Sequence, residues 1–215
     1  DEFAALAASA DYVPVYRRLV SDALTPVSAF HKIDDGVSAC LFESVIGCEK
    51  VGRYSFLAAE PFLLLEARGN DVTVIRLQLQ ARDAPDDAAS SVLAEEKFSN
   101  DNPLDVLREQ VEASGVAEVP GLPPFPGGAV GYAGYDTVRY VENLPSAPAD
   151  DRRLPDLAFA FYDHMVVFDN VQKTIVVVAL AAVGEATSQN EIEQSRRAAC
   201  ERVDRLVEKL SKPSG

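Results

Sequence analysis

The chain has 215 residues, of which 47% are hydrophobic and 25% are charged. These values are typical of a globular protein and exclude disorder, a collagen helix or a coiled-coil array as the architecture of the whole chain. The 34 acidic residues outnumber the 20 basic ones and give a net charge of −14, which argues against nucleic acid and anionic membranes as partners because both are negatively charged.

No segment predicts a membrane span or a secretory signal. The longest apolar run, Ile175–Val183, is about half the length that a membrane-spanning helix requires, and it predicts a buried strand instead. The three cysteines, at positions 40, 48 and 200, include no C-x-x-C pair and are expected to be reduced thiols. We therefore expect a cytoplasmic protein.

The first half of the chain is predicted to be rich in strands. Residues 1–11 form an Ala-rich arm that is expected to be loosely held, and the apolar spacing after Pro14 predicts a short helix. Alternating polar and apolar residues over 26–42, with a turn at Asp34-Asp35-Gly36, predict a hairpin. Further strands are predicted at residues 54–58, 62–66 and 72–79.

The second half is predicted to mix strands and helices. Residues 81–97 have no periodicity and predict a loop, and a helix is expected after Asn102-Pro103. A Gly-rich strand is predicted at 127–135. Two long strands, at 157–168 and 174–182, are predicted to form a hairpin. The spacing of Ser188 and Glu191 predicts the start of a last helix. Because strands and helices do not alternate regularly, the fold class is α+β, with antiparallel sheets packed with a few helices.

No catalytic constellation is visible in the sequence. His31 and His164 both fall in predicted strands, where a lone histidine is most often a half-buried polar group, and Asp163 would point to the opposite face from His164. There is no G-x-S-x-G elbow and no metal-ligand spacing, so we predict no catalytic residue, no metal ligand and no cofactor in this chain. The glycines at 127, 128, 131 and 134 lack the Lys-Ser/Thr of a phosphate loop and indicate close approach of another backbone or a ligand.

The most informative segment runs from Phe42 to Phe56. Glu43 and Ser44 place a carboxylate beside a hydroxyl, and Arg53, Tyr54 and Ser55 follow about ten residues later. Folded together, these side chains would hold a zwitterion, with Glu43 on the ammonium and with Arg53 or the hydroxyls on the carboxylate. An ordinary pair of strands with a surface ion pair is the alternative, and composition alone favours it over the zwitterion site.

Several motifs in one register resemble a known family. Phe42-Glu43-Ser44 and Gly52-Arg53-Tyr54-Ser55-Phe56 resemble the L-L-E-S and G-R-Y-S-F signature of anthranilate synthase component I. The resemblance spans about residues 12–182, although Val51 stands where the family usually has Trp. Its other matching segments are Val15-Tyr16-Arg17, Pro26–Phe30, Pro124–Tyr132, Glu142–Pro145, Leu154-Pro155-Asp156 and Tyr162-Asp163-His164.

The resemblance implies a regulatory domain without an active site. The family converts chorismate to anthranilate, toward tryptophan, with ammonia or glutamine-derived ammonia and with Mg²⁺ held in a C-terminal chorismate-binding domain. Residues 12–211 are then expected to be the N-terminal regulatory domain, and residues 212–215 to begin a linker to an absent catalytic domain. The chain starts at Asp1 rather than Met, and alone it is expected to be an inactive part of a lyase.

The resemblance also implies an effector and partners. Feedback inhibition by L-tryptophan places the effector at Glu43 and Ser44, with Arg53, Tyr54 and Ser55 as weaker candidates. The expected protein partners are the chorismate-binding domain of the same parent and a glutamine amidotransferase subunit, and the surface left open by the missing domain would favour self-association. The alternatives are the corresponding part of aminodeoxychorismate synthase component I, of folate biosynthesis, and a non-catalytic binding or scaffold module.

Overall fold

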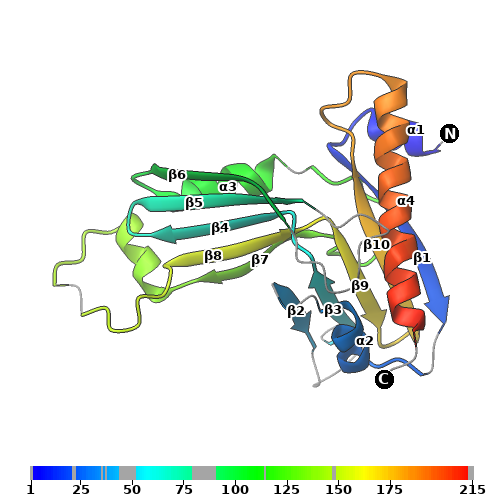
Figure 1. Ribbon diagram of the computed structural model, residues 1–215, viewed down its shortest axis with the longest axis horizontal. Coiled ribbons are helices and arrows are strands. Elements are labelled where there is room, and N and C mark those ends of the chain that lie inside the picture. Colours follow the sequence, from blue (N-terminus) through cyan, green and yellow to red (C-terminus); the bar gives the residue numbers. More distant parts are fainter. Residues whose placement is uncertain are drawn as a thin grey trace.

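The computed structural model describes residues 2–20, 23–34, 36, 38–43, 52–78, 91–113, 115–146 and 149–212. Within them the chain forms ten strands, four α-helices and one 3₁₀ helix (Figure 1). In chain order these elements are α1 (Glu2–Ala7), β1 (Tyr12–Val20), α2 (Pro26–Ile33), β2 (Ala39–Phe42), β3 (Tyr54–Ala59), β4 (Leu63–Arg68), β5 (Asp71–Gln78), β6 (Ser91–Ser99), α3 (Pro103–Glu112), β7 (Gly128–Ala133), η1 (Tyr135–Tyr140), β8 (Leu157–Tyr162), β9 (His164–Asp169), β10 (Thr174–Ala182) and α4 (Gln189–Ser211).

The strands make two five-stranded sheets. The first sheet has the order β1-β10-β9-β3-β2 and the second has the order β6-β5-β4-β8-β7, and every pair of neighbouring strands in them is antiparallel. The chain passes between the sheets at two points, Glu60–Phe62 and Asp163. This arrangement confirms the predicted α+β class.

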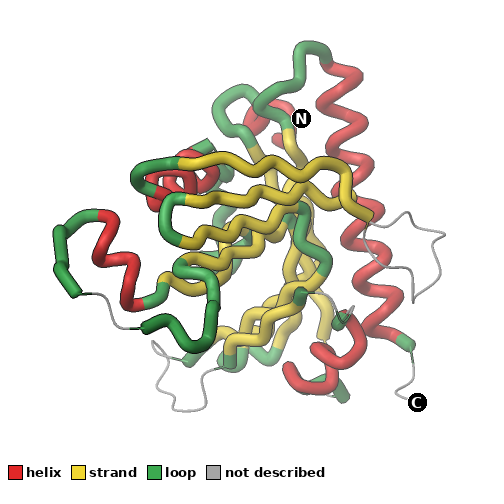
Figure 2. Tube along the Cα trace, turned by 60° about the vertical axis from the view of Figure 1, so that its left-hand side comes forward, coloured by secondary structure: helices red, strands yellow, loops and turns green. Residues whose placement is uncertain are grey.

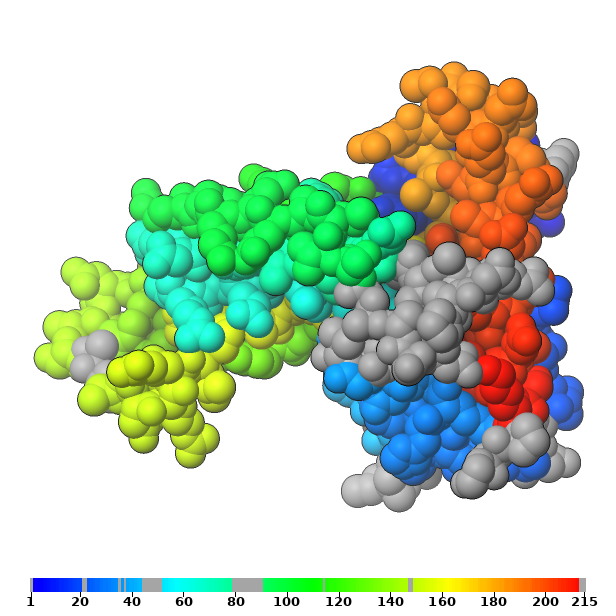
Figure 3. Space-filling view, viewed as in Figure 1, coloured from blue at the N-terminus to red at the C-terminus, as the bar shows by residue number. Residues whose placement is uncertain are grey.

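Helices cover one face of each sheet. Helix α4 lies along the first sheet and buries Ala199, Val203 and Leu206 against it, and α2 packs beside its C-terminal end. Helix α3 contributes Val106 to a second apolar cluster with strands of the second sheet. Figure 2 shows α4 at one side of the molecule, and Figure 3 shows the second sheet as a lobe that projects from the rest. No helix in the described part of the chain is long and apolar enough to cross a membrane.

Several predicted elements are confirmed. Strands β3, β4 and β5, the hairpin β9–β10, helix α3 and helix α4 all lie where the pattern places them. The Ser188 hydroxyl accepts a hydrogen bond from the Glu191 N–H, and the Glu191 carboxylate accepts one in return from the Ser188 N–H, so the predicted capping box forms. The sequence signals at helix ends and hairpin turns are local and therefore reliable here.

Two predictions near the N-terminus are wrong. The segment after Pro14 is the edge strand β1, not a helix, and Pro14 is tolerated there because an edge strand has one unpaired side. Residues 26–33 are helix α2, not a strand, because Thr25 caps it in a capping box and Pro26 occupies its first turn. The arm that was expected to be loosely held contains helix α1, whose Phe3 packs against the core of the first sheet.

Two further predictions fail in the second half. Residues 91–99 form the exposed edge strand β6, although the loop prediction covered this segment up to residue 97. The predicted strand 157–168 is broken at Asp163 into β8 and β9, which belong to different sheets. An apolar run that crosses from one sheet to the other looks continuous in the sequence because both of its halves are buried.

Candidate functional site

The predicted effector residues lie where β2 ends and β3 begins. Phe42 pairs with Phe56, so the chain on either side of this pair brings Glu43 close to the start of β3. Glu43 is exposed, Tyr54 is half-buried and Ser55 is fully buried. Ser44 lies outside the described residues. The structure therefore brings Glu43 and the 53–55 segment to one end of the first sheet.

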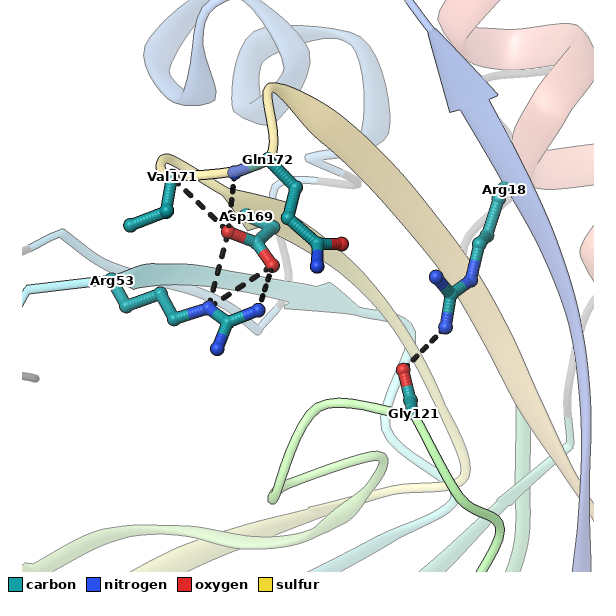
Figure 4. Close-up of polar contacts among 6 residues, drawn as sticks. All are labelled: Arg18, Arg53, Gly121, Asp169, Val171 and Gln172. Atoms are coloured by element: carbon teal, nitrogen blue, oxygen red, sulfur yellow. Dashed lines mark hydrogen bonds and ion pairs between the residues drawn. The ribbon is translucent and has the colours of Figure 1, made fainter. Parts of the chain in front are cut away.

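Arg53 is held by an ion pair with Asp169, at the end of β9. Its Nε donates to both carboxylate oxygens, at 3.2 and 3.1 Å, and its Nη2 donates to Oδ2 at 2.7 Å (Figure 4). The backbone N–H groups of Val171 and Gln172 also donate to Asp169. Arg53 thus fixes the β9–β10 turn. Its third nitrogen, Nη1, contacts no described residue.

The ionisation of Asp169 follows from these contacts. Burial alone would raise the pKa of this carboxyl, but the hydrogen bonds from Arg53 and from the N–H groups of Gln172 and Val171 outweigh burial. The pKa of Asp169 therefore lies below its ordinary value, and the pKa of Arg53 is raised by the same hydrogen bond. The pair is fully charged at neutral pH.

Ser55 and Tyr54 face opposite sides of β3. The Ser55 hydroxyl accepts a hydrogen bond of 3.2 Å from the Asn170 side chain, so it supports the same turn as Arg53. The Tyr54 ring lies 4.9 Å from the Arg53 guanidinium carbon and 5.9 Å from the Phe56 ring. With the exposed ring of Phe42, these side chains give an aromatic surface at this end of the first sheet.

A buried ionic cluster was not predicted. Asp163 Oδ1 lies 2.7 Å from His164 Nδ1, so the two adjacent residues do contact each other, and the prediction that they cannot is wrong. The reason is that Asp163 lies between β8 and β9 rather than inside a strand, so alternation does not apply to it. An acidic residue within the apolar run 157–168 was the one available signal. His31, also assigned to a strand, lies in α2.

Glu60 belongs to the same cluster. Its Oε1 accepts a 2.6 Å hydrogen bond from Lys209 and its Oε2 lies 3.5 Å from Arg205, while Arg202 lies 3.4 Å from Asp163. The three basic residues are spaced by three and four positions, so they share one face of α4. Glu60 has a left-handed backbone, with φ of 53°, which costs about 1 kcal/mol for a residue with a side chain. The ion pairs offset that cost and hold the turn between the sheets.

Burial and nearby positive groups have opposite effects on the pKa values of Glu60 and Asp163. Burial would raise the pKa of Glu60, but the hydrogen bond and charge of Lys209 lower it below its ordinary value. For Asp163 the effect of burial is likewise outweighed, first by the hydrogen bond with His164 and then by Arg202. Both carboxylates are ionised and paired, so the cluster is suited to pinning the two sheet crossings.

Two other sequence interpretations can be compared with the structure. A side chain at Gly131 would lie 2.0 Å from the carbonyl oxygen of Ala158, so this glycine permits close approach of a neighbouring strand, as predicted. Cys40 and Cys200 are free thiols, while Cys48 lies outside the described residues. Among the described residues no group of three or more His, Cys, Asp or Glu side chains is placed to hold a metal ion.

Comparison with known proteins identifies related sequences. A family model described as chorismate binding enzyme matches residues 60–214. Anthranilate synthase component 1 of Synechocystis sp. is 36% identical over 214 residues, which are 98% of this chain and 39% of that protein. The chloroplastic anthranilate synthase alpha subunit 2 of Arabidopsis thaliana is 36% identical over 92% of this chain and 31% of its own length. The chain thus spans about two fifths or less of these relatives.

A solved structure is also similar to this chain. A crystal structure of anthranilate synthase component I from Streptococcus pneumoniae has 23% sequence identity, with a TM-score of 0.48 over 92% of this chain and 37% of that one. The sequence relatives confirm the resemblance predicted from the motifs, and they extend it over nearly the whole chain.

Proposed function

The chain belongs to the chorismate binding enzyme family, and on that premise we propose that it is the N-terminal, tryptophan-sensing part of an anthranilate synthase component I. The observation that carries this proposal is the similarity to anthranilate synthase component 1 over 98% of the chain, combined with the position of Glu43 and Arg53 at one end of the first sheet. The parent protein would convert chorismate to anthranilate in tryptophan biosynthesis.

The geometry suits an aromatic zwitterion. An exposed Glu43 carboxylate would accept the ammonium of tryptophan in charge-assisted hydrogen bonds, and the rings of Phe42 and Tyr54 would contact the indole. Arg53 already holds Asp169 through Nε and Nη2, so its Nη1 is the group that would reach the effector carboxylate. Arg53 would then bind the ligand through Nη1 while its Nε and Nη2 keep their hydrogen bonds to Asp169 in the β9–β10 turn. Ser55, whose hydroxyl is buried against Asn170, would then support the site rather than touch the ligand.

We assign the chemistry to parts of the parent beyond residues 1–215. Magnesium binding and chorismate cleavage would belong to a catalytic domain, and ammonia would be supplied by a glutamine amidotransferase subunit. The chain alone is then inactive, and tryptophan acts by favouring one arrangement of the parent over another. A coupling of about 1–3 kcal/mol between effector and catalytic sites is typical of such regulation.

A second candidate is that this chain itself binds chorismate. The family match over residues 60–214 favours it, because that range includes the whole second sheet. The two candidates differ in their ligand: tryptophan is a zwitterion that needs both an anion and a cation, whereas chorismate carries two carboxylates and needs basic groups. Binding of tryptophan without chorismate would support the first candidate.

Tryptophan emission offers a direct test. The chain has no Trp, so added tryptophan is the only indole in the sample and its emission should shift to the blue on entering an apolar site. Glu43→Ala should weaken binding on the order of tenfold, because hydrogen bonds to charged groups contribute roughly 1.5–3 kcal/mol. Glu66→Ala, which removes an exposed carboxylate from β4, is the matched control and should bind as the wild type does.

The outcome decides between regulation and a scaffold. Equal affinity of the wild type and Glu43→Ala would remove Glu43 from the site. No emission change at any tryptophan concentration would contradict tryptophan sensing by this chain and would favour a non-catalytic scaffold or the aminodeoxychorismate branch.

A further inference from the structure

A cavity of about 340 Å³ is lined by residues of both sheets and of α3. Its apolar wall includes Phe159 and Phe161 from β8 and Leu107 and Val111 from α3. Its volume is within the range of small-molecule sites, which are mostly apolar with a few polar groups that fix orientation. It is large enough for a two-ring aromatic molecule.

Three residues of the lining carry polar side-chain groups. Tyr162 has a hydroxyl that lies 3.2 Å from Ser38 Oγ, Asp163 belongs to the ionic cluster, and the Tyr12 hydroxyl has no hydrogen-bond partner among the described residues. Among the charges that shift the pKa of Tyr12, the carboxylates of Asp163, Asp11 and Glu185 raise it and Arg76 lowers it, while Arg202 lies 3.4 Å from Asp163. Burial first, and then these carboxylates, raise the pKa of Tyr12, so the phenol stays protonated at neutral pH.

The surroundings of Tyr12 and Asp163 would attract a positive group and repel a carboxylate. Asp163 has contacts with His164 and Arg202, so it does not depend on a ligand for its charge balance. The neighbouring acids still make an anion unfavourable there, because like charges brought together at a binding site cost several kcal/mol. A neutral aromatic body with an amine at its end matches the cavity in both shape and charge.

We propose that this cavity is a second small-molecule site, which takes a compact aromatic amine without a carboxylate and orients its amine toward Tyr12 and Asp163. The effector site proposed above is separate. Tyr12 pairs with Ala182 at the end of β10, whereas Tyr54 pairs with Asp169 just before β10 begins. The nine residues of β10 span roughly 26 Å at about 3.3 Å per residue, so an amine held at Tyr12 lies far from Tyr54, although Phe125 on the cavity wall lies 6.0 Å from the Phe56 ring.

Two indole probes of opposite charge test the proposal. Tryptamine carries an amine and indole-3-propionate carries a carboxylate, and each can be titrated by its own emission because the chain lacks Trp. We expect tryptamine to bind at least tenfold more tightly than indole-3-propionate. Tyr12→Phe, which keeps the ring and removes the hydroxyl, should weaken tryptamine severalfold.

Filling the cavity should abolish binding. Ala129 lines it on β7, and Ala129→Leu should weaken tryptamine roughly tenfold or more, since one or two methylene groups in an apolar pocket change affinity by about that factor. Ala133→Leu makes the same change at an exposed position on the same face of β7 and should leave binding intact. Val111→Phe fills the cavity from α3. Val111 is 49% exposed, so the larger phenylalanine ring can be accommodated there without unfolding the protein. This variant keeps the test valid if Ala129→Leu does not fold.

The controls separate this proposal from the proposed function. Tryptamine also carries the ammonium and the indole that the effector site is proposed to hold, so both probes and the cavity variants are compared in the Glu43→Ala background, where tryptamine should still bind the cavity. Equal binding of the two probes, no binding of tryptamine, or undiminished binding by both Ala129→Leu and Val111→Phe would overturn the second site, whatever the result with tryptophan.

Discussion

Glu60 and Asp163 lie at the two points where the chain passes from one sheet to the other, and both are ionised and almost completely buried. A buried carboxylate without a partner would be costly, so the basic face of α4 is a requirement of this connection. Because each carboxylate has contacts to more than one positive or hydrogen-bonding group, the crossing is defined by electrostatics as well as by apolar packing. We therefore expect protonation of the carboxylates in this ionic cluster to be a main cause of the loss of stability at low pH.

The stability of the chain should fall in acid. Glu60, Asp163 and Asp169 all have a pKa below the ordinary value in the folded state, so the unfolded chain binds more protons at low pH. Their contribution is complete above the unfolded values, about 3.9 for Asp and 4.3 for Glu, and is lost as the pH falls through the lower folded values. Urea unfolding should give a free energy that is steady from about pH 7 to 5 and falls below about pH 4.

Glu60→Gln provides the comparison for this prediction. The variant should be less stable at neutral pH by about 1–3 kcal/mol, because Lys209 and Arg205 lose their anionic partner. It should also lose less stability in acid than the wild type, since one titrating carboxyl is gone. Parallel curves for the two proteins between pH 5 and pH 3 would show that Glu60 does not contribute to the acid sensitivity.

At the scale of elements, helix α4 is the part that the rest of the first sheet and the ionic cluster depend on. It supplies the apolar face of the first core and the three basic residues of the cluster. Its start is fixed by the capping box of Ser188 and Glu191. The pKa of Glu191 is lowered, first by the hydrogen bond from the Thr187 N–H, so the cap is charged at neutral pH.

Removing the cap should destabilise the whole chain. Ser188→Ala should lower the free energy of unfolding by about 1 kcal/mol, the usual cost of losing an N-cap side chain. Ser195→Ala makes the same substitution inside α4, where alanine is the better helix former, and should be neutral or slightly stabilising. Equal destabilisation by both substitutions in urea titrations would contradict the role assigned to the cap.

The elements also show what the sequence could reveal. Helix α4 and the β9–β10 hairpin were predictable because their caps, turns and apolar periods are local signals. Helix α2 was not, since eight residues hold only two turns and Ala29 and Ile33 fit an alternating pattern nearly as well. Strand β6 was missed because an exposed edge strand has no buried face to produce alternation.

The candidate site was predictable only in part. The grouping of Glu43 with Arg53 followed from a motif, but the partner of Arg53 did not, because Asp169 is more than a hundred residues away. The ionic cluster could not be predicted for the same reason. Glu60, Asp163 and Lys209 are far apart in the sequence, and the order of strands in the two sheets brings them together. Pairings across a sheet depend on topology, which the pattern of single elements does not specify.

At the scale of the molecule, each sheet has two edge strands. Strand β6 is one edge of the second sheet (Figure 1). It exposes Val92 and Leu93 by 60% and 64%. Long edge strands with exposed apolar side chains tend to pair with other chains. If residues beyond this chain cover that edge in the parent protein, the chain alone presents it to solvent.

The chain should therefore self-associate at high concentration. Sedimentation velocity should show a dimer or larger species, and Leu93→Lys should reduce it, because a charge on an edge strand opposes pairing. Val20→Lys places the same charge on β1, one edge of the first sheet, and should have less effect. A strictly monomeric wild type, or a stronger effect of Val20→Lys, would contradict association through β6.

The central claim is that this chain carries a tryptophan site at the β2–β3 end of its first sheet. Backbone amide shifts recorded while unlabelled tryptophan is added to isotopically labelled protein test it most directly. We expect the changes to cluster at Phe42, Glu43, Arg53 and Tyr54 and to saturate with a single affinity. Changes confined to the cavity around Tyr12, or no changes at all, would contradict the claim.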